Sequence, residues 1–238
     1  FYNHRLKSST TTNLTASEIH QIGLDEVARI TSEMEAIKEK VDFKGTLQEF
    51  FTFIKEDKQF YYPNTDEGRQ AYIDDTEAFY AVIDKQLPNY FGILPKAGLE
   101  VKRVEAFREQ PGAAAHYFPG SPDGSRKGIY FLHLSDMNAM PKGELESVAY
   151  HEGNPGHHMQ ISIAQELTSV PQFRTQAGFN AYSEGWGLYS EWLAIEMGGY
   201  KDPYSDFGRL VNEIWRAVRL VVDTGIHSKG WDEEKAIA

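Results

Sequence analysis

The chain has 238 residues, 41% of them hydrophobic and 25% charged, and its 35 acidic against 24 basic side chains give a net charge of -11. This composition excludes a disordered, collagen-like or coiled-coil protein, and the scattered basic residues argue against a nucleic-acid partner. Cysteine is absent, so any metal must be held by histidine, aspartate or glutamate. No apolar run reaches the ~20 residues of a membrane span, so we expect none.

The first predicted element is a long amphipathic helix over residues 16–40. Thr15 and Glu18 have the spacing of a capping box, and apolar residues recur every three or four positions after them. A second helix is predicted over residues 66–87. It should end before Pro88, because proline disfavours the helical conformation of the residue that precedes it.

The pattern changes to strands between residues 99 and 135. β-Branched and aromatic residues mark 99–107 and 128–134, and the segment 119–124 between them has turn chemistry. The sequence thus predicts an α+β, mostly α fold, with long helices and a small mixed or antiparallel sheet. Further helices are predicted from Pro141 to about residue 152 and over 157–168, 180–197 and 205–222, with a last helix beginning near Trp231.

A single catalytic domain is expected over residues 1–238, because no internal repeat, low-complexity tract or flexible linker interrupts the chain. The sequence begins at Phe1 rather than at methionine and stops at Ala238 inside an incipient helix. We therefore expect a fragment of a longer protein. A chain without cysteine fits either redox compartment, and the pattern predicts no particular oligomeric state.

Three of the eight histidines lie between residues 151 and 158. A histidine followed by glutamate at the end of a helix, as in His151-Glu152, is the first half of a zinc-peptidase motif in which the glutamate is the general base. In an unbroken helix the second ligand stands four residues on, where this chain has Pro155. The sequence therefore predicts a metal site only if the helix breaks.

A break at Pro155-Gly156 would let His157 turn back beside His151. His158 is the alternative ligand, since an ideal helix places it on the same face as His151 but about 10 Å further along. The third predicted ligand is Glu184, because a glutamate in small and aromatic surroundings is costly to bury without a cation. The competing interpretation is structural, with Glu184 paired to an arginine.

The segment His151-Glu-Gly-Asn-Pro-Gly-His-His158 resembles the HExxPGHH motif of the bacterial family catalogued as domain of unknown function 885, whose members are generally regarded as zinc metallopeptidases distantly related to thimet oligopeptidase and angiotensin-converting enzyme. Residues 123–128, 182–186, 216–227 and 10–34 also look like blocks of that family. The resemblance implies a zincin-like core with the metal between the His-bearing and Glu-bearing helices. Members are usually longer, and are cytoplasmic or extracytoplasmic, as secreted proteins or lipoproteins.

The expected function is a zinc-dependent metallopeptidase, a hydrolase that acts on a peptide substrate. One Zn²⁺ per chain would be held by His151, His157 and Glu184, with Glu152 as general base on an activated water. The alternatives are a metal-dependent amide or ester hydrolase with a non-peptide substrate, and a catalytically inert helical binding module or fragment. Metal content separates the inert module from both hydrolases.

Candidate donors to the reacting carbonyl oxygen are Tyr189, Tyr182 and His227, because a phenol or an imidazolium can stabilise a developing oxyanion. The strand at 128–135 precedes the metal helix, as the substrate-binding edge strand does in zincins. His116 and His133 lie in or beside the strands. We expect core or surface roles for both rather than metal ligation.

Arg216, Arg219, Asp223 and His227 form one helical stripe if their helix continues through Gly225. One interpretation is a structural Asp–Arg pair with a helix cap. The other is that Arg216, Arg219 or the turn residue Arg126 binds a substrate carboxylate through two hydrogen bonds. In the Glu184 helix, Glu191 is predicted to orient a ligand histidine.

Overall fold

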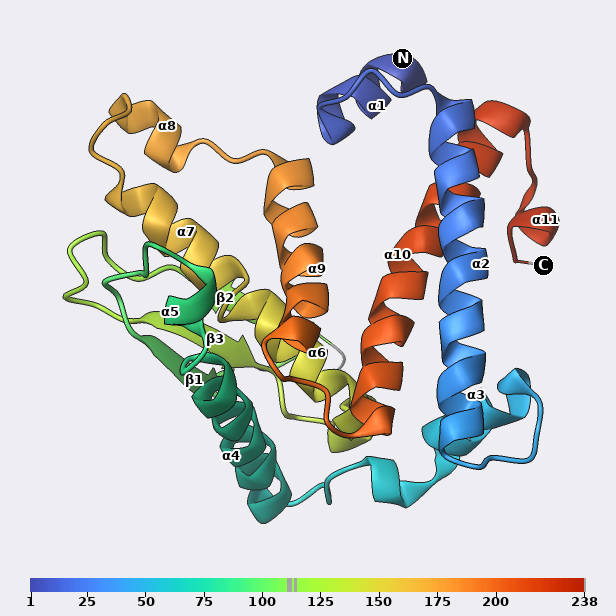
Figure 1. Cartoon of the computed structure of the whole chain (residues 1–238), viewed down its shortest axis with the longest axis horizontal. Coiled ribbons are helices and arrows are strands. Elements are labelled where there is room, and N and C mark those ends of the chain that lie inside the picture. The colour runs from blue at the N-terminus through green and yellow to red at the C-terminus, as the bar shows by residue number, and fades with distance from the viewer. Residues whose placement is uncertain (111–112, 114, 238) are drawn as a thin grey trace.

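The computed structural model describes residues 1–110, 113 and 115–237. The fold is α+β and mostly α, as predicted: a small sheet with α4, α6 and α7 forms one side, and the long helices α2 and α10 lie side by side on the other (Figure 1). The helices are α1 (Tyr2–Thr10), α2 (Ala16–Lys40), α3 (Leu47–Glu56), α4 (Asp66–Ile83), α5 (Leu87–Tyr90), α6 (Lys142–Glu152), α7 (His157–Glu166), α8 (Gln172–Gln176), α9 (Asn180–Glu196), α10 (Pro203–Lys229) and α11 (Glu233–Ile237). The strands are β1 (Leu99–Arg103), β2 (His116–Phe118) and β3 (Gly128–Leu132).

Helix α2 begins and ends as its sequence predicts. The Thr15 hydroxyl accepts from the Glu18 backbone N–H, and the Glu18 carboxylate accepts from the Thr15 backbone N–H at 2.8 Å. The same capping box at Thr46 and Glu49 starts α3, which the sequence analysis missed. Reciprocal bonds of this kind satisfy two N–H groups that the first helical turn leaves open.

The predicted ends of one helix and two strands were wrong. The helix predicted over 66–87 ends at Ile83, and Pro88 lies in the first turn of the short α5, where a missing N–H costs nothing. The strands predicted over 99–107 and 128–134 end at Arg103 and Leu132. Strand ends depend on where the partner strands end, which local sequence does not encode.

Helix α10 is seven residues longer at its C-terminal end than predicted. Gly225 does not end it, and the Trp231 ring packs against this glycine, where a Cβ would lie 2.4 Å from the ring. The helix ends instead at Gly230, whose φ of 71° is the left-handed conformation that glycine adopts most easily.

The sheet is mixed, with strand order β1-β3-β2. β3 pairs in parallel with β1 and antiparallel with β2, so it is the central strand. The strand at 128–135 has the chain position of the zincin edge strand, but it is not an edge strand here, since both its sides are paired. β2 is the edge nearest the histidine-bearing helices, where the Tyr117 hydroxyl contacts His158 of α7.

Helix α6 is held from two sides. Leu145 and Ala149 pack into the core formed with α4 and the sheet, while Tyr150 packs against α9. Buried Glu146 accepts hydrogen bonds from the Tyr150 hydroxyl at 2.8 Å and from the Tyr200 backbone N–H at 2.7 Å. This packing fixes the C-terminal turn of α6.

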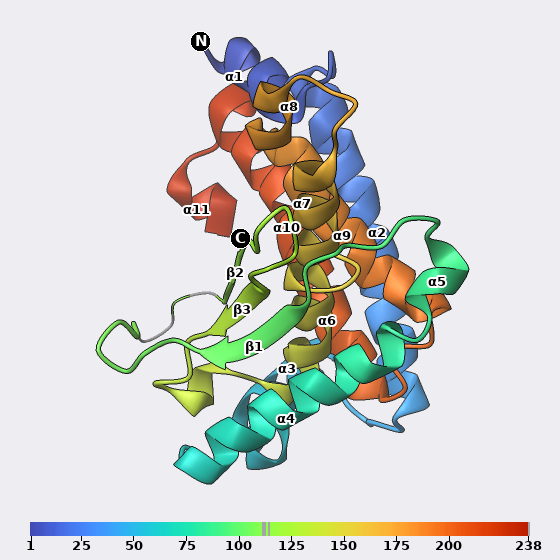
Figure 2. The same ribbon diagram turned by 90° about the vertical axis from the view of Figure 1, so that its left-hand side faces the viewer.

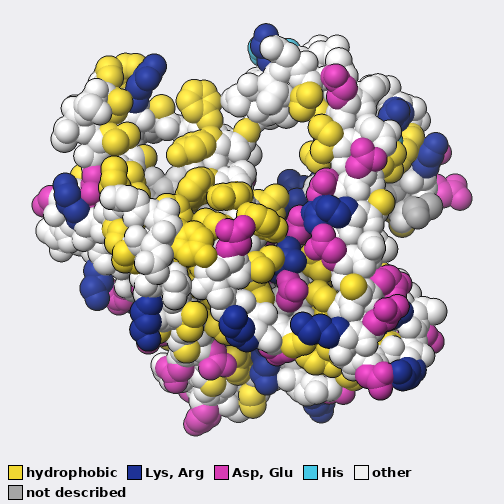
Figure 3. Space-filling model, in the orientation of Figure 1, with side chains coloured by type: hydrophobic (Ala, Val, Ile, Leu, Met, Phe, Trp, Pro, Cys, Tyr) yellow, Lys and Arg dark blue, Asp and Glu magenta, His cyan; other side chains and the backbone are white. Residues whose placement is uncertain are grey.

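Hydrophobic side chains gather on one surface over α9 (Figure 3), where Tyr182, Tyr189, Trp192 and Ile195 are exposed. Within the described ranges, no helix combines the length and the hydropathy needed to cross a membrane.

Candidate metal centre

The helix breaks between His151 and His157. α6 ends at Glu152, α7 begins at His157, and residues 153–156 form a turn between them. Gly156 is required for this turn, because a Cβ there would lie 1.9 Å from the His151 carbonyl oxygen. The Trp186 indole N–H donates to the Pro155 carbonyl at 2.8 Å and ties the turn to α9. The break brings the two imidazole rings to 4.6 Å between centroids.

Glu184 of α9 meets these two rings. His151, His157 and Glu184 each offer one ligand atom, and the three atoms lie within 4.8 Å of one another. The Nε2 atoms of His151 and His157 lie 3.4 Å and 3.7 Å from the Glu184 carboxylate oxygens. Both histidines are buried, whereas the Glu184 side chain is 52% exposed. The cluster can therefore be reached from solvent.

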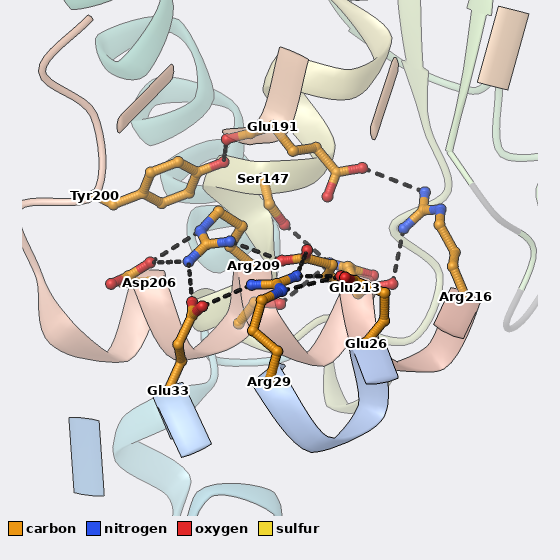
Figure 4. A network of polar contacts seen from close by, with 12 residues as sticks. Glu26, Arg29, Glu33, Ser147, Glu191, Tyr200, Asp206, Arg209, Glu213 and Arg216 are labelled. Carbon is orange, nitrogen blue, oxygen red and sulfur yellow. Dashed lines mark hydrogen bonds and ion pairs between the residues drawn. The ribbon is translucent and has the colours of Figure 1, made fainter. Parts of the chain in front are cut away.

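Glu191, about two turns after Glu184 on α9, fixes the orientation of the His151 ring. Its carboxylate lies 2.7 Å from His151 Nδ1. It also lies 3.3 Å from the Arg216 guanidinium, as Figure 4 shows for these two side chains. Since a carboxylate only accepts, Nδ1 must carry the proton of this hydrogen bond. The Nε2 lone pair of a neutral His151 then faces the Glu184 carboxylate, an arrangement that a proton or a metal cation between them would stabilise.

The acidic surroundings shift the pKa of several groups. Burial lowers the pKa of His151, but hydrogen bonds with Glu184 and Glu191 outweigh it and raise the value to about 9. Burial raises the pKa of Glu152 to about 7, opposed by the charge of His151 and by the Tyr117 backbone N–H. Hydrogen bonding to His151 holds the pKa of Glu184 below its ordinary value.

A cavity of about 350 Å³ opens beside the cluster. Its lining includes four glutamates, and among the described residues that line it Arg216 is the single lysine or arginine. A cavity with this charge balance favours a cation. It is lined by Tyr72, Ala113, Ala115, Ala139, Met140, Pro141, Glu144, Val148, His151, Glu152, Glu184, Glu191 and Arg216.

His158 does not join the cluster. Successive helical residues point about 100° apart, and His158 turns toward the sheet, where its Nδ1 lies 2.9 Å from the Tyr117 hydroxyl. The ring is fully buried, and burial lowers its pKa to about 4. It lines a different cavity, together with Asn154 and Asp84.

Three other candidates lie outside the cavity. Arg126 donates to the Pro119 carbonyl at 2.7 Å and covers the Phe118 ring, so it stabilises the turn between β2 and β3. Arg219 lies 4.5 Å above the Trp215 ring. His227 lies roughly 16 Å beyond Arg216 along α10.

The far end of the α10 stripe holds α1 in place. α10 continues through Gly225, as the stripe required, but His227 contacts the Tyr2 ring and Asp223, and Asp223 accepts from the Tyr2 hydroxyl at 2.6 Å. Asp223 and His227 therefore make structural contacts with α1, but the described partner of Asp223 there is Tyr2 rather than the arginine that the structural interpretation expected. Arg216 alone of the stripe lines the cavity.

Tyr182 and Tyr189, the tyrosines proposed as oxyanion donors, are not among the described residues that line the cavity beside the cluster. The exposed fractions of Tyr182 and Tyr189 are 63% and 46%. Tyr189 lines a separate hollow of about 240 Å³ with Trp192. His116 and His133 lie beside each other at the sheet, with ring centroids 5.5 Å apart, and neither belongs to the cluster of His151, His157 and Glu184.

Two residues at the site were missed. Gly187 lies one turn after Glu184 on α9, and a Cβ there would stand 2.5 Å from the His151 ring. The sequence feature that could have identified Gly187 is its position three residues after Glu184. Tyr117, whose backbone N–H faces Glu152, left no such signal, because strand pairing far along the chain positions it.

Gly187→Ala is expected to weaken zinc binding by about 10- to 100-fold, the range seen when the support of a ligand histidine is disturbed. The added methyl would displace the His151 ring. Competition with a chromophoric chelator measures the affinity. Gly185→Ala is the matched control, since no atom lies within 4 Å of its Cβ position. Equal affinities for the two variants would contradict the predicted role of Gly187.

Comparison with known proteins identifies the family. Residues 1–238 match the family described as "Bacterial protein of unknown function (DUF885)". A crystal structure described as "the putative lipoprotein from Colwellia psychrerythraea" is similar over 99% of this chain, with 40% sequence identity and a TM-score of 0.92. This chain spans 41% of the length of that solved chain, and no curated protein matches it. The chain therefore belongs to the bacterial family DUF885.

Proposed function

We propose that this chain is the metal-bearing part of a zinc-dependent metallopeptidase. The observation that supports this most is the convergence of His151, His157 and Glu184, with Glu152 adjacent in sequence to the first of them. Two imidazoles and one carboxylate are a common ligand set of catalytic zinc sites, which keep a position open for water or substrate.

The residues present fit a divalent cation. Glu191 fixes the His151 tautomer through Nδ1, so that Nε2 presents its lone pair toward Glu184. This is the carboxylate–histidine support that orients ligands at zinc sites. When bound, zinc would lower the pKa of a coordinated water and polarise a carbonyl group.

Glu152 is the proposed general base. Glu152 lines the same cavity as Glu184, and the Tyr117 backbone N–H of β2 contributes to lowering its pKa against the effect of burial. From there it can take a proton from the attacking water and return it to the leaving amine.

The proposed substrate is an extended peptide beside β2. β2 is an edge strand, and Ala113 and Ala115, which precede it, line the cavity. An edge strand binds an extended chain through backbone hydrogen bonds, which place few demands on side chains. The small alanine side chains leave room for such a chain.

Arg216 is the proposed partner of a substrate carboxylate. Its guanidinium lines the cavity, where Glu191 and the Asn212 carbonyl hold it. Peptides with a free C-terminus are expected to be cleaved at least about tenfold faster than their amidated forms, and Arg216→Gln should remove this preference, since a bidentate charge-assisted pair is worth ~1.5–3 kcal/mol. Equal cleavage of both peptides by the unaltered chain would rule out this role.

Metal analysis tests the proposed function. The purified chain is expected to contain about one zinc, to lose it and its peptide hydrolysis to a chelator, and to regain both when zinc is added back. Zinc-dependent cleavage of simple amides or esters but not of peptides would assign a different hydrolase. A zinc-reconstituted chain that hydrolyses none of these substrates would contradict the enzyme proposal.

A further inference from the structure

His158, the motif histidine that the proposed metal site does not use, is fully buried in the first turn of α7. Its Nδ1 atom lies 2.9 Å from the Tyr117 hydroxyl of β2, and the two rings meet edge to face with their centroids 5.5 Å apart. Figure 2 shows the sheet beside α6 and α7. This buried hydrogen bond therefore links the edge strand β2 to the helix that carries His157.

Two further residues accommodate the hydrogen bond between His158 and Tyr117. Gly128, the first residue of β3, lies directly against it: a Cβ there would stand 2.3 Å from the Tyr117 hydroxyl and 2.8 Å from His158 Nδ1. Ser162 follows His158 by one turn of α7, is 4% exposed, and places its Oγ 3.5 Å from the same hydroxyl. A larger residue at position 128 would push the hydroxyl and the imidazole apart, so the backbone of β3 leaves the room that this bond needs.

The strand that this bond reaches is short and borders the metal cavity. β2 is three residues long, is the last strand in the order β1-β3-β2, and pairs with β3 along one side. Ala115, two residues before Tyr117, lines the metal cavity, and the Tyr117 backbone N–H contributes to the pKa of Glu152. A shift of Tyr117 would therefore move the strand wall on the side of the cavity where Glu152 lies.

We propose that His158 is a positioning residue for peptide binding: through the Tyr117 hydroxyl, it holds β2 where an extended substrate can pair with the strand beside the metal cluster. This role rests on the function proposed above and deepens it. His157 and His158 are adjacent, so one turn of α7 supplies both a ligand to the proposed metal and a support to the proposed substrate strand. The position of the peptide backbone is thereby coupled to that of the metal.

Tyr117→Phe tests this role because it removes the hydroxyl and keeps the ring and the backbone of β2. The zinc-loaded variant is expected to have a KM for peptide about three- to tenfold higher than the unaltered chain, the usual effect of one hydrogen bond. Its kcat should stay within about twofold, since an edge strand binds the peptide backbone equally before and during the reaction. A loss confined to kcat would overturn the proposal.

Two variants of His158 separate positioning from packing. Asparagine places its amide close to the position of the histidine Nδ1, whereas the longer glutamine places it close to that of Nε2, and either amide can donate or accept. His158→Gln should therefore raise KM as Tyr117→Phe does, and His158→Asn should restore KM to within about twofold. His158→Gln combined with Tyr117→Phe should raise KM no further than either change alone, because both remove one bond. Equal KM values for the asparagine and glutamine variants would reduce the contact to packing.

Tyr150→Phe is the matched control, because its hydroxyl is also buried and donates to one side chain, Glu146, at 2.8 Å. This bond lies where α6 packs against α9, away from β2. Tyr150→Phe should lower the unfolding midpoint about as much as Tyr117→Phe and leave KM unchanged. A rise in KM equal to that of Tyr117→Phe would show a general effect of lost stability and would overturn the positioning role.

Hydrogen exchange gives a second measurement that needs no activity. In Tyr117→Phe and in His158→Gln, the backbone amides of residues 116–118 should exchange at least about tenfold faster, while those of β1 keep their protection. Unchanged exchange in both variants would overturn the role of His158 whether or not the chain cleaves peptides. Faster exchange in a chain that hydrolyses no peptide would instead refute the proposed function, and with it the substrate role of β2, while confirming that His158 holds the strand.

Discussion

Glu152→Gln is expected to lower peptide hydrolysis by about 10²–10⁴-fold, the usual contribution of a general base, while the chain still binds about one zinc. Glutamine keeps the size of the side chain and a carbonyl oxygen that can accept from the Tyr117 N–H. It cannot take a proton from water. Metal analysis and single-turnover cleavage of a peptide pool measure the two quantities separately.

Glu144→Gln is the matched control for that experiment. Glu144 lies two turns earlier on the same helix and lines the same cavity, so the substitution removes the same charge from the same space. Its activity should stay within a few-fold of the unaltered chain. If Glu152→Gln retains full turnover, or if both variants lose activity equally, Glu152 is not the base.

His157→Ala should abolish stoichiometric zinc binding, whereas His158→Ala should leave about one zinc per chain. The two histidines are neighbours and both are buried, so the two alanine variants lose a comparable buried side chain. Only His157 offers an atom to the cluster with His151 and Glu184, while His158 bonds to Tyr117. Zinc content after dialysis, compared with circular dichroism of each variant, gives the answer.

The reverse outcome would change the assignment of the metal ligand. Zinc retained in His157→Ala and lost in folded His158→Ala would make His158 the ligand. Because His158→Ala also opens a cavity in a fully buried place, its unfolding midpoint is expected to fall, and His158→Gln serves as the better-packed second variant.

The local sequence predicted the structural features that depend on interactions between residues close together in the chain. The capping box at Thr15 and the 3.6-residue period gave the bounds of α2, and Pro155-Gly156 indicated the break that brings His157 toward His151. Packing between distant segments was not predictable in this way. The central place of β3 follows from pairing with residues about 30 positions earlier, and Gly225 in the extended part of α10 packs against a tryptophan that comes after the helix.

The residues of the candidate site also divide into those that the local sequence predicts and those that only the tertiary fold brings to the site. His151, Glu152, His157 and Glu184 stood out because their residue types and spacing are unusual in a helix. The sequence did not show which of Arg216, Arg219 and Arg126 lines the cavity, since only the tertiary fold decides which guanidinium reaches it. Nor did the sequence show that Tyr182 and Tyr189 lie outside the described lining of that cavity, since this depends on how α9 packs.

The broken helix separates this site from motifs that a single helix can form. In a continuous helix two ligands one turn apart are preorganised by the helix alone, about 6 Å apart along its axis. Here the two imidazoles belong to α6 and α7, and their spacing depends on the turn at residues 153–156 and on the indole of Trp186 that anchors it. A synthetic peptide of residues 142–166 should therefore bind zinc far more weakly than the whole chain. In the proposed zinc site, affinity for the metal would therefore report on tertiary structure, and partial unfolding around α9 is expected to release the ion before the helices themselves melt.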